Sequence, residues 1–192
     1  MDENKNNTDV KVTTKTNKNV EDQPTDNTLH INKTKKPSKR TGLRNKMWPD
    51  SESLVWQRKE HKGFTTIPKE LPLIMNMADH LAGGKMDLSR VYLSLWCNVW
   101  DDGFIQVDSI EKMAYEAGYI SKKKTTEWRK RIDKLVELGF IAVKPRGTNL
   151  YGYILIFDPI RIAKILMIKS IDDGSIPEGL INSFSEKQEY IN

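Results

Sequence analysis

Apolar residues recur at intervals of three and four in the segment that follows residue 64, and this spacing places them on one face of a helix. Thr65 or Thr66 is positioned to cap the start of that helix, and Gly83 favours its end. The pattern therefore predicts a first helix with one buried face. Its apolar stripe consists of Leu71, Ile74, Met75, Ala78 and Leu81.

The segment "DLSRVYLSLWCNVW" repeats this spacing and predicts a second helix, with Asp87 as its N-cap. Its two tryptophans, Trp96 and Trp100, are expected in the core because large aromatic side chains at helical spacing are usually buried. Cys97 has apolar neighbours and is expected to be a buried structural thiol. A very short strand is predicted next, over residues 104–107.

Two more helical patterns follow and are separated by the turn "GYIS". Asp108 and Glu111 have the spacing of a capping box, which predicts a short helix over residues 109–117. Ser121 is expected to cap a longer helix that covers about residues 122–138. The apolar positions of this longer helix are Trp128, Ile132, Leu135 and Leu138.

Residues 140–157 contain two short runs of β-branched and aromatic residues around the loop "PRGTNLYG", which predicts a β-hairpin. Asp158 followed by Pro159 is typical of a helix start, so "PIRIAKILMIK" is predicted to be helical. Residues 169–192 are expected to form an acidic C-terminal extension with at most a weak helix.

The first 46 residues hold few large apolar side chains, so we expect a disordered N-terminal tail. Its acidic residues precede His30 and its basic residues follow, which favours either a basic arm that contacts phosphates or a solubilising tail. The ordered domain is expected over residues 47–168, with order beginning near Met47 or Trp56.

Composition excludes several classes of protein. A single cysteine allows no intramolecular disulfide, and no apolar run approaches the roughly 18 residues that span a bilayer. The N-terminal residues show no signal-peptide pattern, so a cytoplasmic protein is expected. Because the chain has no phosphate-binding loop, no paired metal-ligand spacing and no recognisable nucleophile, we expect no enzyme, no metal, no cofactor and no small-molecule ligand.

Positive charge is concentrated at the start of the helix over residues 122–138, in a chain whose formal net charge is +5. Three consecutive lysines at this end oppose the helix dipole, at about a few tenths of a kcal/mol each, so stability does not explain them. The expected hairpin adds two cations. The candidate nucleic-acid contacts are Lys122, Lys123, Lys124, Thr125, Thr126, Arg129, Lys130, Lys144, Arg146 and Asn149.

The order of these elements resembles that of a winged helix-turn-helix domain over roughly residues 64–168, with "MAYEAG" before the turn and "LVELGFI" before the hairpin. "GFTTIPKELPLIM", "YLSLWCNVWDDGF" and "LVELGFIAVKP" also resemble a family of small winged-helix proteins carried on plasmids and other mobile elements of Gram-negative bacteria. One departure is "SKKKTTEW", where Lys124 or Thr125 replaces the usual aliphatic anchor. The turn is therefore longer than usual, or the helix starts later.

The resemblance implies a mainly α fold with a small β-hairpin wing, of the α+β class, and sequence-specific binding of double-stranded DNA. The helix at about 122–138 would enter the major groove, with Arg129 as the preferred guanine contact, and residues 140–157 would be the wing. The expected role is a transcriptional regulator, associated with the nucleoid or a plasmid. The alternatives are an accessory protein of plasmid replication or partition, and a winged-helix protein–protein interaction module. "PIRIAKILMIK" packs within the monomer or pairs in a homodimer.

Overall fold

The computed structural model describes residues 38–50, 53–171 and 173–191. The chain divides into two units, and the division falls between Val55 and Trp56. The second unit contains the elements predicted for the domain and begins at Trp56, the later of the two expected starting points. None of the helices in the described ranges reaches the length and apolar character that a bilayer-spanning helix requires.

The first unit contains one helix, α1 (Lys39–Met47). The expected disorder is therefore wrong for this part of the tail, while the expectation for residues 1–37 lies outside the described residues. Ser38 caps the helix, because its side chain accepts a hydrogen bond from the amide of Thr41 at 3.2 Å. No residue of α1 is buried, so local capping and propensity stabilise it without a core.

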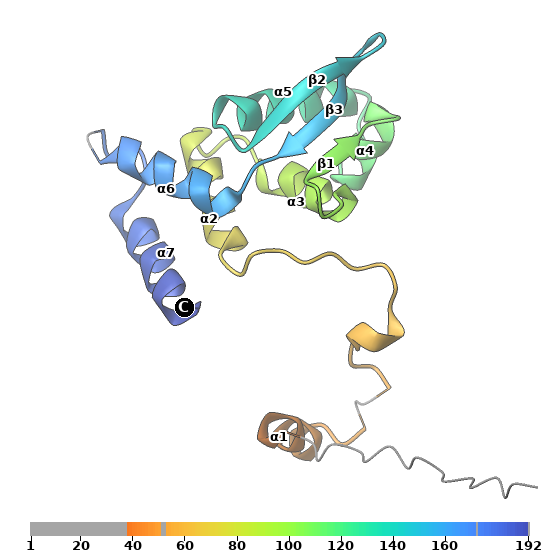
Figure 1. Ribbon diagram of the computed structural model, residues 1–192, viewed down its shortest axis with the longest axis vertical. Coiled ribbons are helices and arrows are strands. Elements are labelled where there is room, and N and C mark those ends of the chain that lie inside the picture. Colours follow the sequence, from red (N-terminus) through yellow and green to blue (C-terminus); the bar gives the residue numbers. More distant parts are fainter. Residues whose placement is uncertain (1–37, 51–52, 172, 192) are drawn as a thin grey trace, which may run out of the picture. The chain divides into compact units, whose positions relative to one another are not determined.

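The second unit is an α+β fold, in agreement with the expected class (Figure 1). Near its start lies a 3₁₀ turn, η1 (Arg58–Glu60). Its helices and strands are α2 (Leu71–Leu81), α3 (Ser89–Asn98), β1 (Phe104–Gln106), α4 (Ile110–Glu116), α5 (Lys124–Glu137), β2 (Ile141–Arg146), β3 (Asn149–Ile156), α6 (Pro159–Ser170) and α7 (Glu178–Ile191).

The predicted hairpin forms, and the predicted short strand joins it to make an antiparallel sheet of order β1-β3-β2. Ile154 on the central strand pairs with Ile105 on one side and Val143 on the other. Ile105 and Ile154 are buried, so this face of the sheet covers the helices. Helix α5 packs against β2, and the turn of the hairpin projects beyond the helices (Figure 1).

The core has the residues that helical spacing predicted. Trp128, Ile132 and Leu135 on α5 are fully buried. Met113 and Ala114 of α4 lie against them, as the close contact between α4 and α5 requires. Further buried side chains come from the helices and loops around this pair and are Ile74, Met77, Leu88, Tyr92, Leu95 and Phe140.

The C-terminal part differs from the expected weak extension. The predicted cap of α6 is confirmed, since Asp158 accepts hydrogen bonds from the amides of Ile160 and Arg161. Helix α7 is 14 residues long and buries Phe184 against the core. Gln188 of α7 also donates to the buried carboxylate of Glu70, just before α2. Both α6 and α7 pack on α2, which gives α7 the tertiary support that its own sequence lacks.

Two expectations about burial are wrong. Trp100 is 82% exposed, because α3 ends at Asn98 and the chain then turns away from the core. Cys97 is exposed as well, since it lies on the outer face of α3 with Leu93, four residues earlier. Trp96 is partly buried and packs against the core.

Several predicted caps are also wrong, because α2 and α5 begin later than predicted without a side-chain cap, and a neighbouring residue caps α4. Helix α2 begins after Glu70 and not at Thr65 or Thr66. Ser109 caps α4 in place of Asp108, by accepting from the amide of Lys112 at 3.2 Å. Helix α5 begins at Lys124, and its N-cap position is Lys123 rather than Ser121.

The start of α3 depends on a carboxylate from another helix. The predicted cap, Asp87, accepts from the amide of Arg90 at 3.2 Å, but the N-cap position is Leu88. Asp79 of α2 accepts from the amide of Leu88 at 2.6 Å, and from the amide and hydroxyl of Ser89 at 3.2 and 2.5 Å. Asp79 therefore joins α2 to α3.

We expect Asp79→Ala to lower the free energy of unfolding by about 1–2 kcal/mol, because it leaves several donors at the start of α3 without their acceptor. Asp79→Asn keeps one acceptor oxygen and should lose less than half of that amount. Urea unfolding followed by circular dichroism measures both. Equal stability of Asp79→Ala and the parent chain would show that these bonds contribute nothing.

Candidate nucleic-acid interface

Helix α5 has two faces with different tasks. Its buried face holds Trp128, Ile132 and Leu135, and its opposite face is exposed to solvent at Arg129 and Lys130. The helix starts two residues later than predicted, which agrees with the second of the two alternatives for this turn. Of the predicted residues at its start, Lys122, Lys123 and Thr126 are exposed, while Lys124 and Thr125 are half-buried.

The first turn of α5 has no side-chain cap. Lys123 occupies the N-cap position, and its own amide donates to Ser121 Oγ at 3.3 Å. The first amides of a helix lack an acceptor within the helix, so an uncapped start leaves donors that point toward solvent. The amide of Lys124 donates to the carbonyl of Ser121 at 3.0 Å. The amides of Thr125 and Thr126, next to the lysines, are therefore the donors that this end of α5 could offer to an anion.

Two of the cations of α5 are paired with a carboxylate of the same helix. Glu127 pairs with Arg131 at 2.9 Å and with Lys130 at 3.3 Å. The Arg131 guanidinium and then Lys130 hold the pKa of Glu127 below its ordinary value. Arg131 turns inward, with its side chain 13% exposed and its guanidinium 4.8 Å from the Tyr119 ring centroid. Arg131 is thus a packing residue, and Lys130 is partly neutralised.

Arg129 differs from these two. Its guanidinium lies 5.9 Å from the centroid of the Tyr151 ring, and no ion pair within the described residues involves it. Tyr151 belongs to β3, and its hydroxyl donates to the carboxylate of Asp133 at 2.9 Å. Burial, together with Asp133, raises the pKa of the Tyr151 hydroxyl, so this group remains a donor at neutral pH.

Tyr151 was not among the predicted site residues, although "NLYGY" gives an aromatic signal in the hairpin. Its ring meets the ring of Trp128 edge-on, with the centroids 5.9 Å apart. The side chain therefore links the hairpin to α5 through a ring contact and a hydrogen bond. Because Arg129 lies beside the Tyr151 ring, this link places its guanidinium between α5 and the hairpin.

A groove of about 560 Å³ lies between the start of α4, the start of α5 and the turn of the hairpin. It brings together three predicted residues, Thr125, Arg129 and Asn149. Two carboxylates, one isoleucine of α4 and three hairpin residues, none of them among the predicted site residues, complete its walls. These are Asp108, Glu111, Ile110, Thr148, Leu150 and Tyr151.

The hairpin residues have different roles. Lys144 and Arg146 are exposed, and Arg146 pairs with Asp108 at 2.7 Å. The amide group of Asn149 is used within the fold, since Nδ2 donates to the carbonyl of Val107 and Oδ1 accepts from the amide of Tyr151. Asn149 therefore shapes the turn and is half-buried.

Gly152 allows the two strands to come close at this turn. A Cβ on Gly152 would lie 2.2 Å from the Cβ of Arg146 and 2.6 Å from its backbone nitrogen. The register also shifts between Lys144 and Arg146, so the hairpin has an irregular ladder at its tip. Glycine at this position thus permits the close approach of the two strands beside Arg146.

The Arg146–Asp108 pair is exposed to solvent, and it shifts the pKa of Asp108. The Arg146 guanidinium, followed by Gln106, holds the pKa of the Asp108 carboxyl below its ordinary value. A depressed carboxyl pKa means that the pair is present at neutral pH and is lost only as pH falls through that lowered pKa. At neutral pH, therefore, the carboxylate of Asp108 is ionised and paired with the guanidinium of Arg146.

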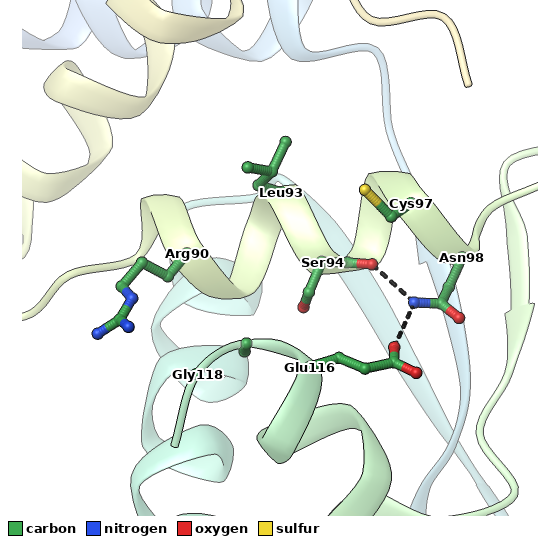
Figure 2. Close-up of a pocket in the computed structure, with 8 residues that line it drawn as sticks. Arg90, Leu93, Ser94, Cys97, Asn98, Glu116 and Gly118 are labelled. Carbon is green, nitrogen blue, oxygen red and sulfur yellow. Dashed lines mark hydrogen bonds between the residues drawn. The ribbon is translucent and has the colours of Figure 1, made fainter. Parts of the chain in front are cut away.

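A second hollow, of about 530 Å³, lies apart from these cations between α3 and the turn after α4 (Figure 2). Asn98 bridges its walls, donating to the carbonyl of Ser94 at 2.9 Å and to the carboxylate of Glu116 at 2.8 Å. Gly118, with φ +84°, forms its rim beside Arg90. The hydrogen bond from Asn98 to Glu116 therefore joins α3 to the end of α4, next to the turn that leads to α5.

Among the residues that the structure describes, no group of three or more histidine, cysteine, aspartate or glutamate side chains is placed to hold a metal ion. Comparison of the chain with family models, with curated proteins and with solved structures gives no match. The function has to be inferred from the residues of the interface.

Proposed function

We propose that residues 64–168 form a winged helix-turn-helix domain that binds double-stranded DNA with sequence specificity. In this proposal α4 and α5 are the helix-turn-helix, α5 is the recognition helix, and the β2–β3 hairpin is the wing. The order α3, β1, α4, α5, β2, β3 and the antiparallel sheet support the assignment. The observation that carries the proposal is the uncapped, lysine-rich start of α5 beside a cationic hairpin.

The division of work among the cations follows from their surroundings. Arg129 forms no ion pair within the described residues and is held near Tyr151, so we assign it to bidentate contact with guanine in the major groove. Lys122, Lys123 and Lys124 lie at the uncapped start of α5 and would contact phosphates, with Thr125 and Thr126 as further hydrogen-bond partners.

The remaining predicted contacts have smaller roles in this proposal. Lys144 and Arg146 would reach the backbone or the minor groove from the wing, after Arg146 exchanges Asp108 for a phosphate. Lys130 would act in the same way by leaving Glu127. Asn149 supports the turn and is a positioning residue rather than a base contact.

The biological role that we propose is transcriptional regulation on a plasmid or other mobile element, as the sequence resemblance implies. A regulator needs one DNA-binding domain, which residues 64–168 would supply in this proposal. A role in plasmid replication or partition would use the same surface on repeated sites. The second alternative, a protein–protein interaction module, is less favoured because it gives the exposed cations of α5 no anionic partner.

The deciding experiment is selection from random double-stranded DNA by the purified full chain at near-physiological salt, followed by sequencing. Enrichment of one motif is the expected result. If about six phosphates are neutralised, log affinity for that motif should fall against log salt with a slope of about −5. Tandem repeats of the motif would favour the replication or partition role. Absence of any binding would refute the proposal and favour the interaction module.

Asp108 makes a separate prediction. Asp108→Asn should strengthen DNA binding several-fold at neutral pH, because it removes a negative charge from the groove and releases Arg146 for a phosphate. The salt slope should become steeper by about one unit, the value expected for one added phosphate contact. Fluorescence anisotropy at several salt concentrations measures both quantities.

Glu116→Gln is the matched control, since it removes the same charge from α4, where Glu116 pairs with Lys112 away from the groove. Its salt slope should stay unchanged. If both variants gain affinity equally, net charge alone explains the effect and Arg146 has no special role.

A further inference from the structure

The outer face of α6 combines isoleucines with cations. Ile165 and Ile168 lie three residues apart on one face of the helix, and Ile168 is 67% exposed. Ile171, directly after the helix, is also exposed. Exposed isoleucines in a row are unusual on a solvated surface. The exposed cations of the same helix are Arg161, Lys164 and Lys169.

The outer face of α7 has the opposite charge. Phe184 marks the buried side of this helix. Glu186 and Glu189 lie away from Phe184 by helical spacing, and both are exposed. Glu178 at the first turn is exposed as well, and Tyr190 is 85% exposed near the end of the helix. Helix α7 thus presents three carboxylates with an aromatic ring.

The charges of these two faces form no ion pairs with each other among the described residues. Both helices pack on α2, so each turns its outer face to solvent. The ion pairs found among the described residues involve other side chains throughout. Three unpaired cations with apolar neighbours therefore lie on one helix, and three unpaired carboxylates lie on the next.

We propose that this surface is a homodimer interface in which α6 of one copy packs against α7 of a second copy. A two-fold axis forms each contact twice, because α6 meets the partner's α7 while α7 meets the partner's α6. The second copy is the occupant that the charges specify, since every chain carries both complementary faces. The isoleucines supply the buried centre, and the charges fix the register.

The inference goes beyond the proposed function and does not depend on it, because it concerns α6 and α7 and not α5 or the wing. If both hold, the dimer presents two recognition helices, and the selected motif is a palindrome. The DNA test and the dimer test fail separately, since the mass of the chain is measured without DNA.

Sedimentation equilibrium of the full chain at low salt tests the interface, and the expected mass is twice 22.2 kDa. Ile168→Asp should give a monomer, because it places a charge at the apolar centre. Leu150→Asp is the matched control, since Leu150 is 71% exposed on the hairpin, and it should remain dimeric. Unchanged circular dichroism would show that both variants fold. A monomeric parent chain at every concentration would overturn the proposal.

Charge reversal identifies the pairing. Reversing α6 (R161E/K164E/K169E) makes both faces acidic, and reversing α7 (E178K/E186K/E189K) makes both basic, so each variant alone should be monomeric. An equal mixture of the two should recover the dimer, because each acidic face then meets a basic one. High salt should weaken this mixed dimer by screening the charges. If the mixture stays monomeric, or if the α6 variant alone stays dimeric, the α6–α7 pairing is wrong.

Discussion

Replacing Lys123, Lys124 and Arg129 together with alanine should weaken binding to the selected DNA motif about 10- to 1,000-fold. Arg129 accounts for most of this loss, because a bidentate arginine–guanine contact contributes about 1–3 kcal/mol. The two lysines act through phosphates and should change the salt slope by about one unit each, from about −5 to about −3. Anisotropy titrations of the motif and of unrelated DNA separate the two effects.

The control variant is R58A/K59A/K62A. It removes two lysines and one arginine, all exposed, from the segment before α2 and away from α5 and the wing. The two triple variants therefore share the same net charge. Equal losses of affinity would show that binding follows total charge and would reject α5 as the recognition helix. A loss confined to the α5 variant, with reduced discrimination against unrelated DNA, would support it.

Trp128→Ala should produce the largest loss of stability, about 3–5 kcal/mol in the free energy of unfolding. Trp128 is fully buried where α5 meets the hairpin, and its ring contacts Tyr151. Its removal creates a cavity under the surface that positions Arg129. Because a domain of this size is stable by about 5–15 kcal/mol, the variant should be close to unfolding. Urea denaturation measures the change.

Trp128→Phe separates packing from hydrogen bonding. The indole Nε1 of Trp128 is buried without a hydrogen-bond partner among the described residues. Phenylalanine removes that donor and keeps an aromatic ring beside Tyr151, so its loss should be less than half that of alanine. A loss as large as that of Trp128→Ala would mean that the indole nitrogen makes an essential bond.

Helical periodicity in the sequence predicted most of the fold. Trp128, Ile132 and Leu135 appear at spacings that only one face of a helix explains, and all three are buried. Such spacing encodes which side chains leave water, and the hydrophobic effect is largely independent of the detailed neighbours. The class of fold, helices α2 to α6 and the hairpin therefore followed from the chain itself, whereas α1 and α7 did not.

Capping and exposure were predicted less well because they depend on neighbours in space. Asp79 serves the start of α3 from a different helix, and no local pattern reveals that contact. Trp100 has the spacing of a core residue, yet the helix ends before it and leaves it in solvent. Helix α7 has a weak pattern of its own and gains its buried contacts from α2.

The candidate site divides in the same way. The sequence by itself determined where positive charge gathers, because consecutive lysines before a buried stripe are visible in the printed order of residues. The tertiary structure decided which of these charges are free. Arg131 is turned inward onto Tyr119, Arg146 is paired with Asp108, and Arg129 is held beside Tyr151. Charge is a property of composition, but its availability depends on the distance to partners from other elements, which only the fold sets.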